Sequence, residues 1–201
     1  MGDPKKQRKK YNTPRFPWRT DTMQEELKLL GQYGLRNKHE LWRHETMLSN
    51  FRGIARSLIG QSPEERQKRE NELLGRLKKI GLLPETAVLD DVLDLALEDL
   101  LERRLQTIVL RKGLAKTMQQ SRQLITHGHV AVGRQRIKTP GYIVTKPEEP
   151  RIAYSQNTPL TNPSHPLRQG MTIVPPSMSE PPERHGEQAP QEGENHSEGA
   201  A

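Results

Sequence analysis

Apolar residues in the first half of the chain recur with the spacing of amphipathic helices. Leucine and other apolar side chains return every three or four positions, which predicts helices over about residues 22–31, 38–60 and 62–81. Thr22 and Glu25 have the spacing of a capping box at the start of the first helix. The first half of the chain is therefore predicted to be all-helical.

The pattern changes after residue 100. Residues 101–112 and 117–128 each predict a short helix with an apolar inner face. Residues 129–138 then alternate like two short strands, with Gly133 placed at the turn between them, and residues 139–144 give another turn and strand. The expected fold class is α+β: an all-helical N-terminal domain plus a small domain of two helices packed on a short antiparallel sheet.

The composition indicates that the two ends of the chain are not packed into either domain. Only 31% of the 201 residues are apolar, which is low for a chain that is packed throughout. We expect an extended basic and aromatic arm over residues 1–20 and the helical domain over 21–100. The α+β domain is expected over 101–165, followed by a loosely structured to disordered acidic tail over 166–201.

Charge is distributed in blocks. The formal net charge is +7, and residues 103–146 contain ten basic residues and no acidic one. Phosphate groups are bound by cations that no carboxylate neutralises, so this block predicts a polyanionic partner, nucleic acid first and anionic membrane second. Residues 85–102 contain seven acidic residues and no basic one, and we interpret them as the solvated outer face of a helix.

The expected nucleic-acid contacts lie in two segments. Arg104 and Arg111 are seven residues apart, so they are predicted to project from one side of a helix. The candidates in the basic block are Arg103, Arg104, Arg111, Lys112, Lys116, Arg122, Gln123, His127, His129, Arg134, Arg136 and Lys138. The arm, in which aromatic rings alternate with cations, adds Lys9, Lys10, Tyr11, Arg15, Trp18 and Arg19.

Metal and catalytic chemistry find little support in this block. The chain has no cysteine, and His127 and His129 have no acidic residue nearby to complete a metal site. The two histidines are interpreted either as hydrogen-bonding groups for RNA or as structural turn residues. Ser121 lacks a local acid that would orient a catalytic histidine. We expect no catalytic residue, no metal and no cofactor. The absence of a long apolar segment predicts a soluble, intracellular protein.

The segment LERRLQTIVLRKGLAKTMQQSRQLITHGHVAVGRQRIKTPGYIV closely resembles the RNA-binding domain named after the S-four protein of the small ribosomal subunit. The arm motif YNTPRFPW and the helical half resemble the archaeal and eukaryotic form of that ribosomal protein, so the likeness extends over about residues 1–155.

The resemblance implies a structural protein of a 30S-type ribosomal subunit that binds the five-prime domain of small-subunit ribosomal RNA. It also implies a role in nucleating assembly of the subunit body. Further implications are contact with the fifth small-subunit ribosomal protein, a place near the path by which mRNA enters, and an influence on translational accuracy. The residues that the resemblance marks for RNA binding are among those derived from charge and spacing.

Two alternatives use the same domain. In one, the domain delivers RNA to a catalytic domain, as in RNA-modifying enzymes, but no segment here has the length or the strand pattern of such a domain. In the other, the chain is a ribosome-biogenesis factor that binds precursor RNA and then leaves. The aromatic, proline-containing arm favours the ribosomal protein.

Overall fold

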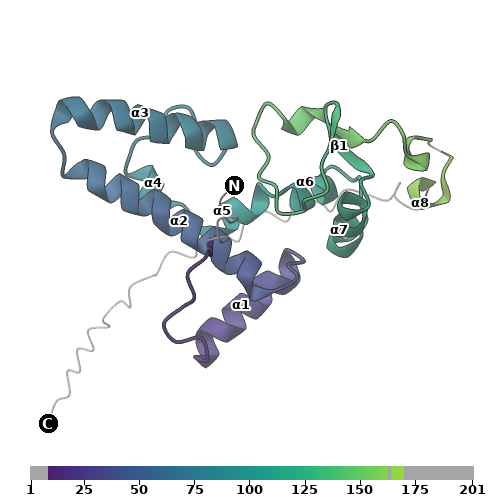
Figure 1. The fold of residues 1–201 in the computed structure, drawn as a ribbon, viewed down its shortest axis with the longest axis horizontal. Coiled ribbons are helices and arrows are strands. Elements are labelled where there is room, and N and C mark those ends of the chain that lie inside the picture. Colours follow the sequence, from purple (N-terminus) through teal and green to yellow (C-terminus); the bar gives the residue numbers. More distant parts are fainter. Residues whose placement is uncertain (1–8, 163, 170–201) are drawn as a thin grey trace, which may run out of the picture.

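The N-terminal half of the molecule is built around one long helix. The computed structural model describes residues 9–162 and 164–169. Its first three helices are α1 (Thr20–Gln32), α2 (Lys38–Ile59) and α3 (Pro63–Ile80). Helix α3 packs along one part of α2, and α1 lies near the other end (Figure 1). The Asn37 side chain caps α2 by accepting a hydrogen bond from the Glu40 backbone N–H at 3.1 Å.

Short elements make up the second half. They are α4 (Asp91–Asp94), α5 (Leu97–Glu102), α6 (Leu105–Arg111), α7 (Met118–Thr126), β1 (Val130–Val132), β2 (Gln135–Arg136), η1 (Glu149–Arg151), β3 (Ile152–Tyr154), η2 (Pro159–Thr161) and α8 (Pro166–Gln169). The strands form an antiparallel sheet in the order β2-β1-β3. Helices α5 and α6 lie between α2 on one side and the sheet with α7 on the other (Figure 1). The expected α+β class is confirmed.

Three apolar clusters hold these elements together. One lies among α2, α3 and the α4–α5 segment and includes the buried Leu77 and Leu100. A second lies under the sheet and includes Val109 and Ile125. The third joins the two halves and consists of Tyr33, Leu35, Leu41 and Leu101. The partly buried Met118 of α7 packs against this cluster, so the cluster links α7 to the helical part.

The structure corrects three expectations of local structure. The helix predicted over residues 101–112 is broken into α5 and α6, because Arg104 has extended backbone and forms an isolated β-bridge with Ile143. The segment 139–144 supplies only that bridge, and the third strand of the sheet is β3 instead. Finally, α1 begins at Thr20, and the Thr22 hydroxyl donates to the Arg19 carbonyl at 3.0 Å, so Thr22 is not the cap.

The acidic segment 85–102 forms two short helices, not one. Its carboxylates are largely exposed, as expected, but two of them have local structural roles. Asp91 accepts a hydrogen bond from the Val88 backbone N–H, and Asp99 accepts one from the Ala96 backbone N–H, each at 2.8 Å. Most of the tail predicted over 166–201 lies outside the described residues.

Candidate RNA-binding interface

Unpaired cations lie in the loop before α7 and in the hairpin that follows it. Lys116, Arg134, Arg136 and Lys138 are all exposed, and none has a side-chain partner within residues 9–162 and 164–169. We call these four residues the free cations. No carboxylate of the described chain neutralises them, so they are available to phosphate groups.

Two glycines shape the surface that carries the free cations. Gly128 follows α7 with a φ of 78°, and the Lys138 side chain passes over it. Gly133 has a φ of 62° and stands in the two-residue turn between Val132 and Gln135, which face each other in the β1–β2 ladder. Positive φ values favour glycine because it has no Cβ. The prediction that Gly133 makes a hairpin turn is confirmed.

Other predicted contacts in the basic block are also exposed. Gln123 and His127 are exposed on and just after α7. Lys112 is exposed too, although its Nζ donates to the backbone carbonyl of Glu149. These three side chains are therefore open to solvent.

Four predicted contacts are instead paired with carboxylates of the protein. Arg103 Nη1 lies 2.8 Å from Glu149, and Arg111 Nη2 lies 2.5 Å from Glu102. Arg104 and Arg122 both bind Glu40. The basic block has no acid of its own, but the fold brings acids from outside it to these four arginines.

The prediction that Arg104 and Arg111 project from one side of a helix is wrong. Arg104 precedes α6 and is fully buried, with its Nη2 at 2.9 Å from Glu40 Oε2. The Arg111 side chain is at the other end of α6 and is 64% exposed. Arg122 is half-buried, at 18% side-chain exposure. Arg104 therefore belongs to the interior and not to an RNA-binding surface.

Electrostatics around Glu40 reflect this interior position. Burial raises the pKa of Glu40, but hydrogen bonds and charge from Arg122 and Arg104 outweigh burial and hold the pKa below its usual value. Nearby His44 is buried, and burial together with the charge of Arg104 lowers its pKa to about 4. His44 is therefore neutral at pH 7. Neither Glu40 nor His44 was among the predicted site residues.

The two histidines of the basic block differ in exposure. His127 is exposed, whereas His129 is half-buried at the start of the sheet, and their rings are 6.2 Å apart. The His129 backbone donates to Leu124 at 2.9 Å and accepts from Ser155 at 2.8 Å, so its main chain links α7 to the segment after β3. Within the described ranges, no three residues of the types that bind metals come together.

The first part of the arm is anchored on α2. The Tyr11 ring lies 4.7 Å from His39 and 6.1 Å from Trp42, and the Asn12 backbone N–H donates to Thr46 Oγ1 at 2.9 Å. Lys9 also contacts the Tyr11 ring, with its Nζ 4.7 Å from the ring centroid. Tyr11, predicted to contact RNA, thus serves in this structure to hold the arm against the protein.

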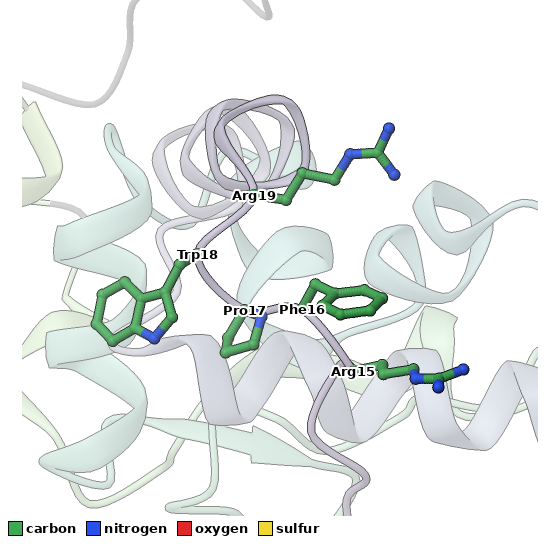
Figure 2. Close-up of a pocket in the computed structure, with 5 residues that line it drawn as sticks. All are labelled: Arg15, Phe16, Pro17, Trp18 and Arg19. Carbon is green, nitrogen blue, oxygen red and sulfur yellow. The ribbon is translucent and has the colours of Figure 1, made fainter.

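The second part of the arm presents exposed rings. Phe16 is 66% exposed and Trp18 is 83% exposed. Together with Arg15, Pro17 and Arg19 they line an open hollow of about 510 Å³. Figure 2 shows Arg15, Phe16 and Arg19 projecting to one side of the arm and Trp18 to the other. Phe16 was not among the predicted contacts, although its place between Arg15 and Trp18 was a signal for it. Lys10 is also exposed.

Comparison of the sequence with known proteins shows which domain and which family the chain contains. A family model described as "S4 domain" matches residues 103–149, which run from the end of α5 to η1. The chain therefore carries the S4 domain. Relatives that align well beyond this domain show to which family the chain belongs.

Three archaeal proteins, each named small ribosomal subunit protein uS4, match most of the chain. The protein of Hyperthermus butylicus is 54% identical over 79% of this chain and 90% of its own length. That of Metallosphaera sedula is 52% identical over 81% of this chain and 91% of its own length. That of Thermoplasma acidophilum is 46% identical over 96% of this chain and 98% of its own length. The chain belongs to the uS4 family of small-subunit ribosomal proteins.

The family match also revises the extent of the resemblance. The likeness was expected over about residues 1–155, but the alignment with the Thermoplasma acidophilum protein covers 96% of the chain and so reaches into the tail segment. No helix within the described residues has the length and apolar character needed to cross a membrane.

Proposed function

We propose that this chain is a structural component of the small ribosomal subunit in the cytoplasm and binds small-subunit ribosomal RNA directly. The observation that carries the proposal is the set of free cations, which no carboxylate of the described chain neutralises. The relatives share a ribosomal name over most of the chain, and none of the three is named as an enzyme.

The proposed RNA surface is smaller than the sequence suggested. It comprises the free cations, residues on and just after α6 and α7, and the exposed part of the arm. Its members are Lys112, Lys116, Gln123, His127, Arg134, Arg136, Lys138, Lys9, Lys10, Arg15, Phe16, Trp18 and Arg19. Cations on phosphates would position the protein, while Phe16 and Trp18 would stack on unpaired bases.

The finer assignments rest on the family resemblance. They are binding to the five-prime domain of the ribosomal RNA, nucleation of subunit assembly, contact with the fifth small-subunit protein, a position near the path by which mRNA enters, and an influence on translational accuracy. The exposed rings and cations of the arm are compatible with an RNA partner and do not distinguish among these assignments.

Equilibrium binding to a transcript of the five-prime domain tests the RNA proposal. The affinity should exceed that for an unrelated structured RNA of equal length, and it should fall linearly with the logarithm of salt concentration. Equal affinity for both RNAs would contradict specific recognition.

Sedimentation of cell extracts separates the ribosomal role from the biogenesis alternative. A structural protein should be found in translating ribosomes, whereas a biogenesis factor should occur only in precursor particles. Finding the protein in precursors alone would reject the ribosomal role while leaving RNA binding intact.

A further inference from the structure

One carboxylate joins the two halves of the molecule. Glu40 lies in the first turn of α2, in the helical half. Its Oε2 is 2.9 Å from Arg104 Nη2, and its Oε1 is 2.5 Å from Arg122 Nη2. Arg104 precedes α6 and Arg122 is part of α7, so a single side chain of α2 holds both helices of the RNA-binding domain.

Backbone contacts beside Glu40 reinforce this link. The Gly34 carbonyl, in the turn between α1 and α2, accepts hydrogen bonds from Gln106 Nε2 at 3.1 Å and from Arg122 Nη1 at 3.4 Å. The turn approaches so closely that a Cβ on Gly34 would lie 2.8 Å from the Met118 Cβ. The turn before α2 is therefore packed tightly against the start of α7. We call Glu40, Arg104, Arg122, Gln106 and the Gly34 carbonyl the Glu40 junction.

Burial makes the Glu40 carboxylate hard to replace. Arg104 is fully buried, and its Nε and Nη1 atoms have no partner among the described residues. Two arginines share one carboxylate, so neutralising Glu40 would leave Arg104 with no partner for its charge. A buried charge without a partner is strongly destabilising, so the loss of Glu40 should weaken the contact between α2 and the helices α6 and α7.

The arm is connected to the same junction through α2. Tyr11 and Asn12 fix the arm to α2 through His39, Trp42 and Thr46, within the same turns of the helix that carry Glu40. The direction in which the exposed ring of Trp18 approaches an RNA therefore depends on how α2 is held against α6 and α7.

We propose that Glu40 is a positioning residue for RNA binding, which holds the arm and the free cations in the one arrangement that lets both reach the same RNA. The inference rests on the proposed RNA-binding function. Two binding segments held rigidly act as a bivalent ligand, because the second segment binds at a high effective concentration once the first has bound. Loosening the junction removes this advantage without removing any contact residue.

Replacement of an acid by an amide tests the inference against simple electrostatics. Glu40→Gln is compared with Glu25→Gln, which neutralises an exposed carboxylate on α1 that has no side-chain partner in the described part of the chain. Charge alone predicts that both variants bind RNA at least as tightly as the wild type. A positioning role predicts that Glu40→Gln binds the five-prime transcript at least about tenfold more weakly, because it loses part of the roughly 10²–10⁴-fold gain that two linked contacts can give, while Glu25→Gln does not.

A second measurement distinguishes positioning from loss of folded protein. Trp18→Ala is introduced into the wild-type and Glu40→Gln backgrounds, and binding is measured where circular dichroism shows each protein folded. Trp18→Ala should weaken binding clearly in the wild type and much less in the Glu40→Gln background. A merely destabilising substitution would leave the factor for Trp18→Ala the same in both.

Glu40→Asp provides a milder variant if Glu40→Gln does not fold. It keeps the charge but shortens the reach by one methylene, so it should bind with intermediate affinity and show a reduced effect of Trp18→Ala. The inference is overturned if the Glu40 variants bind as tightly as Glu25→Gln, or if the effect of Trp18→Ala is equal in all backgrounds. Failure of the wild type to bind the transcript would reject the proposed function instead.

Discussion

Two groups of cations in the same basic block have opposite surroundings. Arg104 and Arg122 are held by Glu40 between the two halves of the molecule, whereas Arg134 and Arg136 stand exposed on the hairpin without a partner in the described part of the protein. Both groups look alike in the sequence, because residues 103–146 contain no acidic residue. Glu40 is 64 residues from Arg104 and 82 from Arg122, so only the fold separates an arginine that supports the structure from one available to RNA.

The buried group should dominate stability. Arg104→Ala removes a fully buried side chain, leaves a cavity and takes one partner from Glu40. We expect the free energy of unfolding to fall by about 3–5 kcal/mol, the usual range for breaking a buried pair. Urea denaturation measures it. Arg136→Ala, the matched exposed control, should stay within about 0.5 kcal/mol of the wild type. Similar losses for both variants would remove the distinction between the groups.

Lowering the pH should destabilise the protein through His44, which is buried beside Arg104 and Glu40. Burial and the charge of Arg104 lower the pKa of His44 from 6.5 to about 4, while Glu40 acts in the opposite direction and Arg43 adds to the lowering. In the unfolded chain, His44 therefore becomes protonated below about pH 6.5. In the folded protein it becomes protonated only below about pH 4. Stability should fall by about 3 kcal/mol as pH drops through this window.

His44→Leu tests the origin of that pH dependence. Without the imidazole, the decline between about pH 6.5 and 4 should largely disappear when unfolding is followed at several pH values. Below the ordinary pKa of a glutamate, protonation of Glu40 should weaken both proteins alike, because its depressed pKa stabilises the fold only while the carboxylate is charged. A decline that persists unchanged above about pH 4.5 in His44→Leu would exclude His44 as its source.

The sequence predicted what local patterns determine and missed what distant contacts determine. The turn at Gly133 and the start of α2 at Lys38 were predicted correctly, because turn and helix signals lie within a few residues. The break before α6 and the third strand were missed, because both depend on pairing partners far along the chain, such as Ile143 for Arg104. For the same reason, the distribution of charges along the sequence could not reveal that Glu40 forms an ion pair with Arg104.

The exposed group should dominate RNA binding. Arg134→Ala combined with Arg136→Ala removes two exposed cations whose side chains have no hydrogen bond or ion pair in the described chain, so stability should stay within about 0.5 kcal/mol of the wild type. Affinity for the five-prime transcript should fall on the order of tenfold, and the slope of its salt dependence should decrease by about two. Binding assays over a salt series measure both. An unchanged slope would mean that these arginines do not meet phosphates.

The smallest change in stability is expected at Gly133, in the turn between β1 and β2. Gly133 has a φ of 62°, and a Cβ there would meet no atom within 4 Å, so Gly133→Ala adds backbone strain without a clash. Thermal or urea denaturation should show a loss of about 1 kcal/mol. A Cβ on Gly53 in α2 would also meet open space, but the backbone there is helical, so Gly53→Ala should raise stability by about 0.5–1 kcal/mol. Opposite signs for the same chemical change would show that the hairpin depends on its left-handed residue, whereas equal signs would refute that dependence.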